Sequence, residues 1–235
     1  MKVGDIMTRD QYLQKVENIL VQKSPYGSYH QENFDNYRTL GDMAPINSAI
    51  ISDIPFGQVI LSNEVYQFLN AVCDVTNEDR KEIPFFLYGY ETQPNVVEFS
   101  EAYTSSDDRH STMATFNSDM VHNLGERMRE SLNTKLVVCH GHSHPPIGDV
   151  HENFSLGDFT SYVEMNEENS VFRDHQVDLM GCLVTSSGDI NFVFYDNLVE
   201  NFYRFTEVYV KENDNSLRPV NTYGLKQADN GGFTR

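Results

Sequence analysis

The sequence predicts a mixed α/β fold, in which a central mixed β-sheet is flanked by helices and preceded by an N-terminal helical extension. Apolar runs such as residues 59–62 and 83–89 have the length and composition of buried strands. Polar segments alternate with these runs, and within residues 118–132 the apolar side chains recur at helical spacing. A chain of 235 residues can bury a sizeable core, so one domain with an extension is expected.

The extension is expected to cover residues 1–56. Residues 8–23 are predicted to be helical, because Thr8 can cap the helix, Gln11 can complete a capping box, and four apolar residues follow at helical spacing. These four are Leu13, Val16, Ile19 and Leu20. Residues 24–47 are rich in Gly, Pro, Asn, Ser and Tyr without steady periodicity, which predicts a long connection whose aromatic residues pack on the domain.

The main domain is expected to cover residues 57–211. Its strands are predicted at 59–62, 83–89, 95–103, 135–144 and, as two strands joined by a turn at 186–189, within 177–196; its helices are predicted at 63–73, 118–132 and 155–165. Residues 204–213 can add a last strand. Residues 212–235 are polar and rich in turn formers, which predicts a loose C-terminal tail.

Composition narrows the class of protein. A net charge of -18 argues against nucleic acid as a partner, because phosphate binding needs clustered Lys and Arg. The same acidity fits plain solubility or steering toward a basic partner. Three scattered cysteines fit reduced thiols better than a disulfide framework. The N-terminus lacks the apolar stretch of a signal peptide and no apolar run is long enough to span a membrane, so a cytoplasmic protein is expected.

Three histidines alternate at the end of an apolar run: His140, His142 and His144, followed by Pro145. Strand alternation points them to one face, where two imidazoles separated by one residue can chelate one metal ion. A single histidine is more often structural, but this pattern favours a metal site, and Zn²⁺ suits imidazole combined with carboxylate. His140 lies deeper in the strand, so His142 and His144 are the predicted ligands.

A catalytic zinc site usually has three protein ligands and one open position for water, so a third ligand is needed. Ser155 and Asp158 stand three residues apart at a predicted helix start, where such residues share a face. A capping box, with Ser155 as the cap, explains the same pattern structurally. Because the pair follows the histidines after one loop, Asp158 is predicted to be the third ligand.

An activated water also needs a group that takes its proton and passes it to the leaving amine. Glu82, at the start of the apolar strand 83–89, is the candidate. A glutamate at a strand edge is more often a solvated charge. Sequence spacing alone does not bring Glu82 to the histidines.

A glutamate before an apolar strand that ends in glycine, then His-Ser-His-Pro, then Ser-x-x-Asp, resembles the JAMM motif of JAB/MPN-type zinc metalloproteases and isopeptidases. The resemblance implies a cytidine-deaminase-like sandwich in which His142, His144 and Asp158 bind one zinc ion per chain. It also implies that Glu82 is the general acid/base and that Ser155 helps to stabilise the oxyanion.

The resemblance covers about residues 57–196, where the order of strands and helices is also similar. It implies hydrolysis of a peptide or isopeptide bond, as in deubiquitinases, after the C-terminal tail of ubiquitin or a ubiquitin-like protein. Other relatives process small sulfur-carrier or amino-acid conjugates, so the substrate stays open at this point.

One feature departs from the family pattern. Thirteen residues, 145–157, separate His144 from Asp158, a few more than in the family. The longer loop contains Asp149, His151 and Glu152. These residues can cover the metal, supply another ligand or contact substrate, and His151 can equally be a solvated loop residue.

Other classes fit less well. Amidohydrolases and PHP-type phosphoesterases also use two alternating histidines, but at the start of a barrel of roughly 250 residues, and too little chain follows His144. The metallo-β-lactamase pattern fails because Pro145 and Pro146 replace its Asp-His. A catalytically silent MPN-like scaffold for protein association is the non-enzymatic alternative, and zinc content with a hydrolysis assay separates it from an enzyme.

Overall fold

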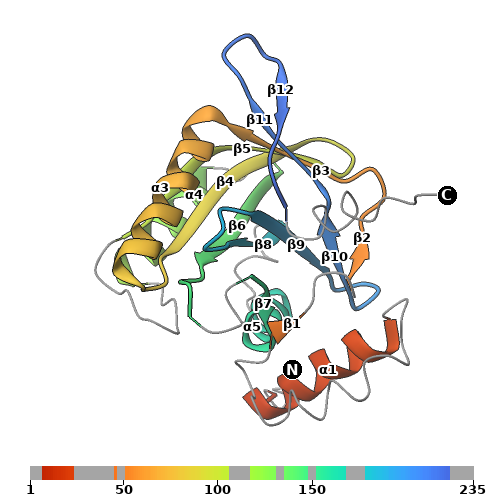
Figure 1. The fold of residues 1–235 in the computed structure, drawn as a ribbon. Helices are drawn as coiled ribbons and strands as arrows, with labels where there is room; N and C mark the ends of the chain where they lie inside the picture. The colour runs from red at the N-terminus through yellow and green to blue at the C-terminus, as the bar shows by residue number, and fades with distance from the viewer. Residues whose placement is uncertain are drawn as a thin grey trace, which may run out of the picture.

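The computed structural model of the chain describes residues 7–23, 45–46, 51–105, 117–130, 135–147, 152–167 and 178–222. The fold of this part is mixed α/β, as predicted, with a curled ten-stranded mixed sheet between helices (Figure 1). In spatial order its strands are β12 (Leu217–Pro219), β11 (Glu207–Lys211), β3 (Gln58–Ser62), β5 (Val96–Tyr103), β4 (Pro84–Gln93), β6 (Leu136–Ser143), β8 (Asp178–Val184), β9 (Ile190–Asp196), β10 (Asn201–Phe205) and β2 (Ser52–Asp53).

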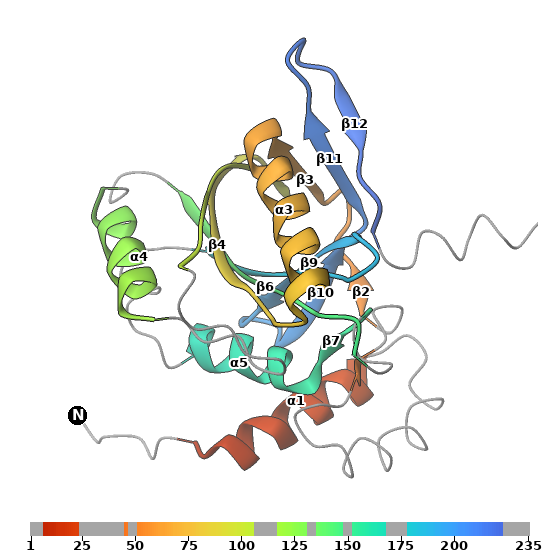
Figure 2. The same cartoon turned by 60° about the vertical axis from the view of Figure 1, so that its left-hand side comes forward.

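The side chains of β4 show how the sheet divides the core. Phe85 and Leu87 point to the face covered by α3 (Asn63–Asp79), whereas Phe86 and Tyr88 point to the face of α4 (Ser118–Glu130). Figure 2 shows β4 passing between these two helices. Because successive side chains of a strand alternate, a strand covered on both faces reads as a continuous apolar run.

The face that carries α4 also carries α5 (Leu156–Glu167), and α1 (Arg9–Lys23) packs on α5. β1 (Pro45–Ile46) and β7 (Phe154–Ser155) form a separate antiparallel pair immediately before α5. The described parts of the first 56 residues therefore share a core with the main domain, and β2 pairs with β10. The division of the chain into three segments stays a prediction.

Several elements differ in extent from the prediction. The helix expected at 63–73 continues to Asp79, where Arg80 adopts a left-handed conformation and its N–H bonds the carbonyl of Thr76. The single strand expected at 204–213 is in fact β10 and β11, separated only by Thr206. These two strands lie toward opposite ends of the strand order, so the sheet must curl to bring its ends together.

The beginning of the expected loose tail is ordered. Residues 212–216 turn the chain back, and β12 pairs antiparallel with β11. Val220 and Thr222 are buried after this hairpin. Residues 223–235 lie outside the described part of the chain.

Among the described residues, none of the helices combines the length and apolar character needed to cross a membrane.

Candidate metal centre

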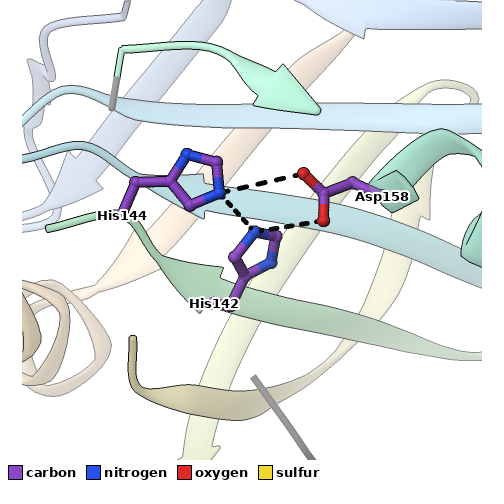
Figure 3. A group of neighbouring side chains, drawn as sticks. All are labelled: His142, His144 and Asp158. Carbon is purple, nitrogen blue, oxygen red and sulfur yellow. Dashed lines mark hydrogen bonds and ion pairs between the residues drawn. The ribbon is translucent and has the colours of Figure 1, made fainter. Parts of the chain in front are cut away.

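The predicted histidine pair stands at the end of a central strand. β6 is paired with β4 on one side and with β8 on the other, and the N–H of His144 extends the pairing by donating to the carbonyl of Val184 (3.0 Å). His142 and His144 are 4% and 6% exposed. Their Nε2 atoms lie 3.0 Å apart. Figure 3 shows the two rings turned toward each other. Strand alternation thus turns both imidazoles toward one point.

Asp158 reaches the same point from the first turn of α5. Its Oδ1 lies 3.3 Å from Nε2 of His142, and its Oδ2 lies 3.8 Å from Nε2 of His144 (Figure 3). The candidate ligand atoms of these three residues all lie within 4.8 Å of one another. The structure therefore brings together the three residues that the sequence singled out.

Ser155 and Asp158 also form a capping box. The N–H of Asp158 donates to Oγ of Ser155 (3.2 Å), and the N–H of Ser155 donates to Oδ2 of Asp158 (2.7 Å). The hydroxyl of Ser155 donates to the same Oδ2 (2.9 Å). The structural and the ligand interpretations of this motif are thus compatible, because Oδ2 caps the helix while Oδ1 faces His142.

The donor set fits a metal ion. Four ligands held tetrahedrally at about 2.1 Å lie roughly 3.4 Å from one another. The donor separations of 3.0, 3.3 and 3.8 Å around His142, His144 and Asp158 bracket that value. Two neutral imidazoles and one carboxylate also match the donor chemistry of a divalent metal ion.

The electrostatics of the group are those of a buried ion pair. Burial lowers the pKa of His142, but the Asp158 carboxylate, its hydrogen bond and the charge of Glu82 outweigh burial and raise this pKa to about 9. Burial raises the pKa of Asp158, but His142, His144 and the N–H of Ser155 outweigh it and hold that pKa well below its usual range. The carboxylate is therefore ionised throughout the physiological range.

Glu82 belongs to the same corner of the sheet. Pro84 pairs with His142, and the N–H of Ser143 donates to the carbonyl of Ile83 (3.2 Å). Continuing this antiparallel register sets Glu82 opposite His144, on the same face of the sheet. Glu82 is 8% exposed, so it is not a solvent-exposed glutamate at a strand edge, which was the alternative interpretation of this residue.

Sequence analysis missed the side chains that hold Glu82 in register. Ser143 points to the opposite face, where its Oγ accepts from the N–H of Ile83 (3.0 Å) and lies 2.5 Å from Oγ1 of Thr76 in α3. Ser143 and Thr76 are buried. Strand alternation is the one sequence pattern that could have indicated this role. Ser143 lies between two candidate ligands of the same strand, so its side chain must point to the opposite face of the sheet.

His140 lies outside the group of candidate ligands. Its ring makes edge contacts with the rings of Phe86 and Tyr162. Burial, together with the charge of His142, lowers the pKa of His140 to about 3, so it is neutral. This environment suits a core histidine.

Only part of the long loop can be placed. Residues 148–151, and with them Asp149 and His151, lie outside the described residues, so their expected roles stay predictions. Glu152 is described, and its carboxylate accepts from the hydroxyl of Ser187 in the turn between β8 and β9 (2.8 Å). It is not part of the group around His142.

Neither protein-family models nor curated proteins identify a relative of this chain. The chain matches no protein-family model. No curated protein is significantly similar to it.

Proposed function

We propose that this protein is a zinc-dependent hydrolase of the JAMM type that cleaves a peptide or isopeptide bond, with a ubiquitin-like or other protein conjugate as substrate. One observation supports the proposal: His142, His144 and Asp158 converge within 4.8 Å. The pairing of Pro84 with His142, continued by two residues, would bring Glu82 opposite His144. The sequence order of these four residues is the order of the JAMM motif.

The metal would be zinc because imidazole and carboxylate suit this borderline ion, with three protein ligands and an open fourth position. When bound, the ion would lower the pKa of a water to about 7 and polarise the scissile carbonyl. His142 must lose its proton to become a ligand. The burial of the ligands strengthens the electrostatic interactions within the site.

Glu82 supplies the proton transfer. Its carboxylate accepts a proton from the attacking water, whose oxygen bonds to the carbonyl carbon. Glu82 then delivers the proton to the amide nitrogen as the carbon–nitrogen bond breaks, which leaves a carboxylic acid and an amine. The second proton of the water passes from the acid to the amine, so the final products are a carboxylate and an ammonium group. Because one residue takes and returns the same proton, no further acid is needed.

Ser155 is the proposed donor to the developing oxyanion. Its hydroxyl now donates to Asp158 Oδ2 at 2.9 Å, so it would have to rotate toward the substrate. The backbone N–H of Ser155 can keep capping Asp158 during this rotation, because it donates to the same oxygen independently (2.7 Å).

The test combines metal content with turnover. Purified, zinc-loaded protein should hold one zinc per chain and should cleave at least one member of a panel of ubiquitin-like conjugates and peptide amides. Glu82→Gln protein, which lacks the acid/base, is the matched negative control. Protein that binds no zinc would refute the proposal, whereas zinc binding without any hydrolysis would favour the silent MPN-like scaffold.

A further inference from the structure

We propose that the N-terminal arm, defined as α1 (Arg9–Lys23) together with β1 (Pro45–Ile46), positions Asp158 and thereby completes the metal centre. The proposal rests on the metal-dependent function proposed above. The arm contributes no metal ligand among the described residues. It acts through α5 and β7, so its side chains are positioning residues.

The first contact is between helices. Tyr12 and Val16 of α1 are buried in one apolar cluster with Phe159 and Val163 of α5. Figures 1 and 2 both show α1 lying against α5 on the side away from the ten-stranded sheet. The helix that carries Asp158 is therefore enclosed between the sheet and the arm.

The second contact reaches the turn that carries the ligand. Nη2 of Arg9 donates to the carbonyl of Gly157, immediately before Asp158 (3.3 Å), and Nη1 pairs with Oε2 of Glu164 (2.9 Å). A guanidinium can hold two acceptors in a fixed geometry, which a lysine ammonium cannot do as well. Arg9 thus ties the first turn of α5 and a later one to α1.

The third contact is a strand pairing that involves Ser155, the residue that caps α5. Pro45 pairs with Ser155, and Ile46 pairs with Phe154. The side chain of Ile46 is fully buried, in the same apolar cluster as Phe154. β1 therefore holds the cap residue Ser155 through a strand pairing.

These contacts converge on the carboxylate. Ser155, held by β1, donates twice to Oδ2 of Asp158, and Gly157, held by Arg9, is its neighbour in the chain. The orientation of Oδ1 toward His142 thus depends on two residues that the arm restrains. The histidine pair depends instead on the ladders of β6. Loosening the arm should therefore release one ligand of three.

The test compares two cations of the same helix. Arg9→Gln should weaken zinc affinity about 10-fold, the size typical of an outer-shell partner of a ligand. Lys15→Gln is the matched control, because the ammonium of Lys15 pairs with Glu200 in the turn between β9 and β10 (3.1 Å), and it should leave the affinity unchanged. Ile46→Val should act in the same direction as Arg9→Gln, with a smaller effect. Chelator competition measures the affinity.

A second measurement does not depend on zinc. In metal-free protein, Arg9→Gln should speed hydrogen exchange at the amides of Ser155 and Asp158, which form the capping box, and should leave the amides of β6 unchanged. Equal acceleration in β6 would mean a general loss of stability and would overturn the proposal. Unchanged affinity together with unchanged exchange would overturn it too. If wild-type protein binds no zinc, the proposed function fails, and the exchange pattern alone decides whether the arm positions Asp158.

Discussion

The candidate metal centre joins two regions of the molecule that are held in different ways. His142 and His144 stand at the end of β6, which is hydrogen-bonded to a strand on each side. Asp158 stands on α5, which is attached by side-chain packing, a capping box and the N-terminal arm. A central strand cannot shift without breaking two ladders, whereas a packed helix can slide. The histidine pair therefore gives the centre its rigidity, and the carboxylate is its adjustable part.

Loss of a histidine from the rigid region should have the largest effect. His142→Ala and His144→Ala are each expected to abolish tight zinc binding, because removing a ligand costs more than the roughly 10- to 100-fold cost of losing an outer-shell partner. His140→Ala should keep the metal, since its ring packs against Phe86 and Tyr162. Elemental analysis after dialysis decides between these outcomes. Zinc lost from His140→Ala but kept by His144→Ala would show that the ligand assignment is wrong.

Glu82→Gln should separate chemistry from metal binding. The variant is expected to keep zinc and lower kcat by at least about 100-fold, because it removes only the proton carrier. Glu98→Gln is the matched control, since that carboxylate pairs with Lys211 of β11 at 2.9 Å and should leave kcat unchanged. Full activity of the Glu82 variant would exclude the mechanism, and loss of zinc would make Glu82 a ligand.

The ion pair between the two regions predicts opposite pH trends with and without metal. The pKa of His142 is raised to about 9 from 6.5, so its contribution to the stability of metal-free protein is complete below about pH 6.5 and is lost as the pH rises through 9. This shift corresponds to about 3 kcal/mol. The pKa of Asp158 is lowered, so its contribution is present above the ordinary carboxyl range and is lost in acid.

Zinc must displace the proton of His142, so its affinity should rise over the same interval in which metal-free stability falls. Thermal unfolding of metal-free protein and chelator competition, both followed from pH 5 to about pH 9.5, measure the two trends. His142→Ala protein should lose the fall in metal-free stability between neutral pH and about pH 9. A fall that persists in this variant would contradict the assignment of the raised pKa to His142.

The buried hydroxyl pair of Thr76 and Ser143, which joins α3 to β6, can be weakened without changing a candidate ligand. Thr76→Val removes the hydroxyl that lies 2.5 Å from Oγ of Ser143 and should cost about 1 to 3 kcal/mol of unfolding free energy. Thr76→Ser keeps a hydroxyl and should recover most of that loss. Urea unfolding measures both variants. Equal stability of the two would mean that this buried pair does not hold the strand of Glu82.

The smallest effect is expected at the cap of the adjustable region. Ser155→Ala removes the oxygen that accepts from the N–H of Asp158 and should lower the stability of metal-free protein by about 1 kcal/mol. Ser155→Thr keeps this acceptor and should stay close to wild type. Thermal unfolding checks both, and an unchanged stability of Ser155→Ala would contradict the capping role.

Local patterns made the convergence of the three candidate ligands predictable. Alternation along one strand fixes the common face of His142 and His144, and the three-residue spacing of Ser155 and Asp158 fixes a helix start. Sequence could not choose between the cap and the ligand interpretations of Asp158. Capping the helix and binding a metal each need one carboxylate oxygen, and the side chain of Asp158 has two, so the two roles do not exclude each other.

The remaining parts of the site depend on long-range contacts. The position of Glu82 opposite His144 follows only when the register of β4 and β6 is continued beyond Pro84, and no local pattern specifies this register. Arg9 and Gly157 are 148 residues apart in the chain. The aromatic-rich sequence between α1 and β1 has no periodicity. It therefore could not predict that α1 packs on α5 or that β1 pairs with β7. Thr206 is the only residue between β10 and β11, which lie toward opposite ends of the sheet. Its sequence context contains no pattern typical of a turn.

The short distance between His142 and Asp158 has a consequence for how the candidate site would take up a metal ion. With its pKa near 9, His142 carries a proton at neutral pH and lies 3.3 Å from the carboxylate. In metal-free protein that proton lies between the two side chains and favours an arrangement in which the three donors face a common point. A metal ion would then replace the proton among donors that are already assembled, so little reorganisation would oppose its binding. The rate of loading should accordingly follow the availability of the deprotonated imidazole rather than a folding step.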